Sequence, residues 1–145
     1  MKTKNDWTIH YCTNCICDNC GEVKMEFLPY TCNAHTHGLE KYGHMDFQVV
    51  LALPLKEISY ILNTLSQRVQ AGEQFKAGDY VSGIFLDCNI RLDEYEETDR
   101  QILRVVIPDQ NNHFPEHPEC KPPYPLQLLK TDDLYCWKGS DGTCS

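Results

Sequence analysis

The chain has 145 residues, of which 41% are hydrophobic and 23% are charged, a composition typical of one globular domain spanning 1–145. Twenty-one acidic residues against 13 basic residues give a net charge of −8, which argues against binding to the phosphate backbone of nucleic acids. No apolar run approaches the length of a membrane span and no leader pattern opens the chain. We therefore expect a cytoplasmic protein that does not contact a membrane.

A cysteine cluster at 12–20 follows eleven mostly polar residues that we expect to be frayed. It contains two C-x-x-C pairs, Cys12 with Cys15 and Cys17 with Cys20. The chain has nine cysteines, an odd number that cannot all form internal disulfides, and clustered thiols in a reducing cytosol more often bind metal. Four thiolates suit Zn²⁺, so the cluster predicts a structural zinc site in a Cys-rich N-terminal segment.

Two alternatives to a four-cysteine site stay open. A single residue separates the two C-x-x-C pairs, which leaves little chain to turn both pairs onto one ion. Later groups would then complete the site, and the candidates are Cys32, His35, His37, Cys120 and His117. Alternatively the pairs are free thiols that cycle with an oxidant, which makes the chain a thiol-redox protein.

The next elements are two strands and a helix. Residues 30–37 are rich in Thr and Tyr and predict a short strand, and residues 47–53 predict a strand that is apolar on both faces and internal to a sheet. Pro54 ends this strand and suits the first turn of a helix. Apolar residues then recur at spacings of three and four and predict a helix over 55–71: Ile58, Ile61, Leu62, Leu65 and Val69.

Beyond Gly78 the apolar period changes to two, which predicts strands over 81–86, 88–93 and 101–107, the last two joined as an antiparallel hairpin. The acidic stretch 87–99 is interpreted as a solvated face and turn. Six prolines within 108–125 exclude a helix there and predict a loop, followed by a short strand over 126–129 and a tail over 131–145. The order predicts an α+β domain, with a mostly antiparallel sheet packed by one main helix.

Several of these stretches resemble a known family. They are T-H-G-L-E-K-Y-G-H-M-D-F at 36–47, L-P at 53–54, I-L-N-T-L-S-Q-R-V at 61–69 and D-Q-N-N-H-F-P-E-H-P at 109–118. In order and spacing they are similar to the bacterial domain-of-unknown-function family 4262, over about residues 30–130. The resemblance implies no established chemistry. Thr36 and His44 fit its motif and Asp46 stands where Glu is usual, whereas His35 and His37 do not match, so it implies no metal role for that pair.

Four polar residues near the predicted strands are candidates for catalysis. His35 and His37 share one face of a strand because side chains alternate, and His44 and Asp46 follow within a dozen positions. Three imidazoles and a carboxylate around an open position would suit a zinc ion that activates water, which is the hypothesis of a metal-dependent hydrolase. His44 and Asp46 are also a candidate acid–base pair, because a carboxylate can orient an imidazole and raise its basicity.

Candidate ligand-binding residues lie on the predicted hairpin and in loops. Arg91 and Arg104 would clasp an anionic small molecule or pair with nearby carboxylates. Loop aromatics would stack on a ligand ring or cover the edge of the core: Tyr42, Phe114, Tyr124 and Trp137.

No catalytic set is complete, and whether the chain is an enzyme stays open. The leading hypothesis is therefore a small, non-catalytic zinc-binding protein that binds a small molecule, a nucleotide-like ligand or a protein partner. The metal-dependent hydrolase and the thiol-redox protein are the alternatives.

Overall fold

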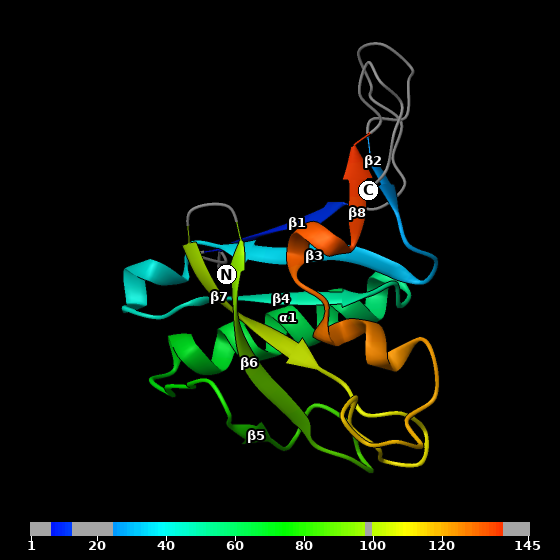
Figure 1. The fold of residues 1–145 in the computed structure, drawn as a ribbon. Helices are drawn as coiled ribbons and strands as arrows, with labels where there is room; N and C mark the ends of the chain where they lie inside the picture. Colours follow the sequence, from blue (N-terminus) through cyan, green and yellow to red (C-terminus); the bar gives the residue numbers. More distant parts are fainter. Residues whose placement is uncertain (1–6, 13–24, 98–99, 138–145) are drawn as a thin grey trace.

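The computed structural model describes residues 7–12, 25–97 and 100–137. They form a six-stranded sheet in the order β1-β3-β4-β7-β6-β5, which contains every strand except two (Figure 1). Its strands are β1 (Thr8–Cys12), β3 (Thr31–His37), β4 (Asp46–Leu51), β5 (Tyr80–Val81), β6 (Ile90–Glu97) and β7 (Arg100–Val106). Neighbouring strands are antiparallel except β4 and β7, which are parallel. The predicted α+β class with a mostly antiparallel sheet is confirmed.

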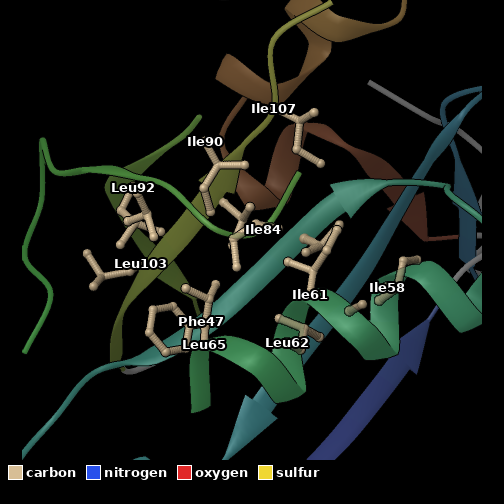
Figure 2. Packing of buried hydrophobic residues seen from close by; sticks show 14 of the residues in the cluster. Phe47, Ile58, Ile61, Leu62, Leu65, Ile84, Ile90, Leu92, Leu103 and Ile107 are labelled. Atoms are coloured by element: carbon tan, nitrogen blue, oxygen red, sulfur yellow. The ribbon is translucent and has the colours of Figure 1, made fainter. Parts of the chain in front are cut away.

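The main helix, α1 (Leu55–Gln70), covers one face of this sheet. Its buried stripe is the one that the apolar spacing predicts, and it packs against alternate residues of β4 such as Phe47 and Val49. Figure 2 shows Ile61, Leu62 and Leu65 beside Phe47, with Leu92 and Leu103 of the hairpin in the same layer. Burial of one large apolar side chain stabilises a fold by about 1.5–3 kcal/mol, so this layer holds the helix to the sheet.

The other face of the sheet is covered by the C-terminal part of the described chain. This part contains the 3-10 helices η2 (Tyr124–Leu128) and η3 (Thr131–Asp133), and it ends in β8 (Tyr135–Trp137). β8 pairs with β2 (Met25–Phe27) in a separate two-stranded sheet (Figure 1). Val50 of β4 packs here with Phe27 and Leu134. The segment 131–137, which we predict as part of a tail, is therefore folded onto the domain.

A fully buried arginine joins this second layer to the sheet. Arg104 of β7 donates from Nε to Gln48 Oε1 at 2.8 Å and from its terminal nitrogens to Thr131 and to the carbonyls of Gln127 and Leu129. Its guanidinium carbon also lies 3.6 Å from the centre of the Tyr95 ring. A buried cation is tolerated only where acceptors surround it, so Arg104 fixes the path of η2 and η3.

Three local predictions are wrong. Residues 8–11 are not frayed but belong to β1, because Trp7 is buried and donates to Asn63 Oδ1 at 2.9 Å, which ties the N-terminal part to α1. Beyond Val81 the chain bends at Gly83, whose φ of 89° does not fit a strand. The short strand expected over 126–129 is instead η2.

The error at 126–129 has a physical explanation. The side-chain amide of Gln127 bonds to both the N–H and the C=O of Ile107, at 2.7 Å each. It thereby satisfies the backbone of Ile107, just beyond the end of β7, as a paired strand would, so no strand pairing is needed there.

Within residues 7–12, 25–97 and 100–137, none of the helices combines the length and the hydrophobicity that a membrane span requires.

Candidate functional site

A cavity of about 230 Å³ lies beyond the carboxyl ends of β4 and β7. Its apolar lining comes from segments that are distant in the sequence: Leu53, Phe85, Ile107 and Pro108. Parallel neighbouring strands end at the same edge of a sheet, and this edge is where open sheets with parallel strands commonly bind ligands. A wider surface hollow of about 530 Å³ adjoins the cavity and shares Asp87, Cys88 and Asn112 with it.

The polar lining of the cavity is acidic. Glu57 in the first turn of α1, Asp87 and Asp109 contribute carboxylates, and the described residues that line the cavity include no Lys or Arg. Burial, followed by the charges of Asp109 and Glu57, raises the pKa of the Tyr124 phenol. The cavity is therefore a site of negative potential with an apolar body.

The pKa of the Cys88 thiol is affected by the same acidic surroundings. Burial raises the pKa of Cys88, and the negative charge of Asp87 raises it further. The thiol therefore stays protonated at neutral pH, which makes it a poor nucleophile.

The Asp109 carboxylate also shapes the loop that closes the cavity. It is buried, and it accepts backbone N–H bonds of 2.9 to 3.0 Å from Asn111, His113 and Lys121. Burial opposes ionisation of Asp109, but these bonds outweigh it and hold the pKa of the carboxyl below its usual value. A permanent negative charge is therefore fixed at this wall.

The candidate pair His44 and Asp46 lies at the other end of β4. Asp46 is buried, accepts from Thr36 Oγ1 at 2.8 Å and forms an ion pair with Arg100 at 2.6 Å. The ring of His44 bonds through Nδ1 to the carbonyl of Met45 at 2.7 Å and accepts through Nε2 from a backbone N–H at 2.9 Å. Within the described chain, no hydrogen bond joins His44 to Asp46. The acid–base hypothesis stays a prediction to which this geometry adds no support.

His35 and His37 are brought together, as their spacing predicts, and His10 of β1 joins them. Each residue offers one ligand nitrogen, and the three nitrogens lie within 4.8 Å of one another. The pKa of His37 is lowered first by burial, then by the charge of Arg100, and then by the imidazoles of His35 and His10. Sequence reasoning missed His10 because β1 is not predicted, although its alternation with Ile9 and Tyr11 is a weak strand signal.

Cys32, a further candidate ligand, lies apart from these histidines. It is fully buried in the core that faces α1, and its thiol donates to the carbonyl of Leu51 at 3.3 Å. Cys12 ends β1, and its side chain lies outside the described residues, as do Cys15, Cys17 and Cys20. The structural zinc site and the thiol-redox alternative therefore both stay predictions.

Four of the predicted ligand-binding residues do not line the cavity: Arg91, Arg104, Tyr42 and Phe114. Arg91 is paired with Asp93 at 2.8 Å and Glu116 at 2.7 Å, as the hypothesis of nearby carboxylates expects in part. Arg104 is buried among its acceptors, and the Tyr42 hydroxyl accepts from Gln70 at 3.1 Å.

The aromatic loop residues differ in their position relative to the cavity. Phe114 packs edge-on against Tyr80, with ring centres 5.4 Å apart, beneath the guanidinium of Arg91. Tyr124 does line the cavity. Trp137 lies in β8 and its side chain is outside the described part of the chain, so among the described loop aromatics Tyr124 is the one placed to touch a ligand there.

These features define a small α+β domain with a ligand-sized cavity at the carboxyl ends of its parallel strand pair. The chain belongs to the family described as Domain of unknown function (DUF4262), whose model matches residues 22–121, so the resemblance is confirmed. No curated protein and no solved structure matches the chain. Two stretches that carry the family resemblance meet at the cavity, since Leu53 comes from the L-P stretch and Asp109 and Asn112 come from 109–118.

Proposed function

We propose that this protein binds a small organic cation, such as an alkylammonium compound, in the cavity at the carboxyl ends of β4 and β7. The observation that carries the proposal is the lining itself: three carboxylates beside apolar side chains, with no Lys or Arg among the described lining residues. The proposal concerns binding and includes no catalytic step.

Electrostatics favour a cation over the nucleotide-like ligand that the sequence also allows. A phosphate group would meet the negative charges that, after burial, raise the pKa of Tyr124 and Cys88. An ammonium group would instead be stabilised by the carboxylates, and a hydrogen bond to a charged group contributes about 1.5–3 kcal/mol. The apolar side chains would cover a short hydrocarbon body, and the small volume of the cavity restricts the length of that body.

The test compares three ligands that share a pentyl group and differ only in their polar end: pentylamine, pentan-1-ol and hexanoate. Binding is followed by NMR, through the backbone amide of Asn112 in the cavity wall and that of Lys130 as a distant reference. We expect saturable shifts at Asn112 with the amine, weaker shifts with the alcohol and none with the carboxylate. Equal binding of all three ligands, or no saturable shift with the amine, would overturn the proposal.

Substitutions locate the bound ligand. We expect Glu57→Gln and Asp87→Asn each to weaken amine binding by roughly tenfold or more, because each removes one charge-assisted contact. Glu119→Gln is the matched control, since Glu119 is an exposed acid of the 108–125 loop that does not line the cavity. A similar loss in the control would show that net charge, not the cavity, attracts the amine.

A further inference from the structure

A cluster of three imidazoles lies on the edge of the sheet, on the face opposite α1. β1 is an edge strand, and its antiparallel register places His10 directly opposite His35 of β3. His37 follows two positions later and therefore shares the face of His35. His35 pairs in register with Gln48 of β4, which points to Arg104 and away from the helical layer. Two separate strands thus aim three ligand-bearing rings at one point.

The distances suit a single metal ion. The ring centres of His10 and His37 are 4.5 Å apart, those of His35 and His37 are 4.8 Å apart and those of His10 and His35 are 5.6 Å apart. One nitrogen from each ring lies within 4.8 Å of the others. Tetrahedral Zn²⁺ with bonds of about 2.1 Å holds its ligand nitrogens about 3.4 Å apart, so small side-chain rotations would close the set.

A second shell already orients one of the three rings. His35 Nδ1 lies 3.0 Å from Asn33 Oδ1, and the same oxygen accepts from Gln48 Nε2 at 3.1 Å. An amide oxygen accepts only, so Nδ1 of His35 carries the proton and the lone pair of the neutral ring is on Nε2. Metal-binding histidines usually have such an acceptor on the other nitrogen. Asn33 and Gln48 are themselves buried, which fixes this orientation.

From this geometry we infer that His10, His35 and His37 bind one divalent late first-row transition ion, with Zn²⁺ as the expected occupant. Imidazole nitrogen suits zinc, copper, nickel and cobalt, and three histidines leave a coordination position for water or a ligand. His10 and His37 are exposed and His35 is half-buried, so an ion reaches the site from solvent. This site is separate from the proposed amine cavity, with which it shares no residue.

Titration of the full chain with Co²⁺ separates this site from any cysteine site. Cobalt bound by thiolates shows intense sulfur-to-metal charge-transfer absorption, whereas cobalt bound by imidazoles shows visible bands without it. We expect one equivalent of thiolate-free Co²⁺ in the parent protein. Loss of a second-shell partner weakens metal binding by up to about 100-fold. His10 and His37 would bind the ion directly, so His10→Gln and His37→Gln should each weaken Co²⁺ binding by more than that. Both residues are exposed, so circular dichroism should show an unchanged fold.

Three further variants, at two positions, complete the test. His117→Gln changes an exposed histidine of the 108–125 loop and should leave the thiolate-free bands unchanged. Asn33→Ala should weaken the site about tenfold, whereas Asn33→Asp, which keeps an acceptor oxygen, should bind as tightly as the parent protein. The inference is overturned if the parent protein shows no thiolate-free Co²⁺, or if His10→Gln and His37→Gln keep it.

Discussion

The two ends of strand β4 carry carboxylates in opposite situations. At its amino end, Asp46 is 5% exposed, and both of its oxygens have partners within the chain, Thr36 and Arg100 among them. Beyond its carboxyl end, Glu57 is half-buried and Asp87 is exposed, and both line a cavity beside Asp109, which is itself buried and bonded to backbone N–H groups. Carboxylates at one end of β4 are therefore bonded within a closed network, whereas Glu57 and Asp87 at the other end face an open space.

The difference separates stabilisation from binding. A buried carboxylate whose acceptors are all used holds its surroundings in place, and its removal leaves donors unsatisfied. A carboxylate that faces a cavity adds little to folding, but it meets a ligand cation without first breaking an internal ion pair. The motif around Asp46 is accordingly a structural tie, and the lining of the cavity is the place for recognition.

The largest expected effect comes from Asp46→Ala. This change leaves the guanidinium of Arg100 and the hydroxyl of Thr36 without their buried acceptor, so the free energy of unfolding should fall by about 3 kcal/mol. Urea denaturation followed by circular dichroism measures the loss. Amine binding to the folded fraction should stay unchanged, because the cavity lies at the other end of β4.

Asp132→Ala is the control for this change, since Asp132 is exposed and its loss should alter the free energy of unfolding by no more than about 0.5 kcal/mol. If Asp46→Ala were as stable as the control, the ion pair would contribute nothing. If it abolished amine binding without a loss of stability, the division between the two ends would be wrong.

A smaller loss is expected for His44→Ala. The imidazole accepts from the backbone N–H of Phe75 and lies 5.4 Å from the Phe47 ring, so the free energy of unfolding should fall by about 1–2 kcal/mol. The exposed change Lys56→Ala serves as the neutral reference. Thiolate-free Co²⁺ binding should be retained, and its loss would instead support the predicted hydrolase set, in which His44 is a metal ligand.

The parts of the fold that the sequence predicts are those whose signal is local. α1 follows from apolar spacing between Pro54 and Gly72, and the β6–β7 hairpin follows from alternation on either side of a short connection. β1 has no comparable signal, because Trp7 is placed by the main core and by its hydrogen bond to Asn63, 56 positions away. η2 likewise depends on the distant bonds of Gln127 to Ile107.

The same limit applies to the sites. The pair His35 and His37 is visible in the sequence because both residues lie on one strand, whereas His10 depends on a pairing that only the fold reveals. The cavity gathers residues from segments around 53, 87, 109 and 124. In the sequence, Asp87 belongs to an acidic stretch interpreted as solvated surface, and nothing in that stretch indicates that the chain bends it towards Glu57 and Asp109.

The smallest expected effect measures the potential inside the cavity through Cys88. Burial and the charge of Asp87 both raise the pKa of this thiol, so little thiolate is present near neutral pH and alkylation is slow. Asp87→Asn removes the charge but keeps the shape of the side chain, which should lower the pKa of the thiol. At pH values below the pKa of the parent thiol, alkylation should then be a few-fold faster. The gain should shrink as the pH rises and the parent thiol also ionises.

Peptide mapping after brief iodoacetamide treatment gives the rate at Cys88 separately from the other cysteines. Cys120 is the internal reference, because its raised pKa comes from burial and from Asp109 and Glu116, not from Asp87. An unchanged Cys88 rate in Asp87→Asn would mean that Asp87 does not contribute to the potential of the cavity. Amine binding would then have to depend on Glu57 and Asp109 alone, and the open end of β4 would be less acidic than its lining residues indicate.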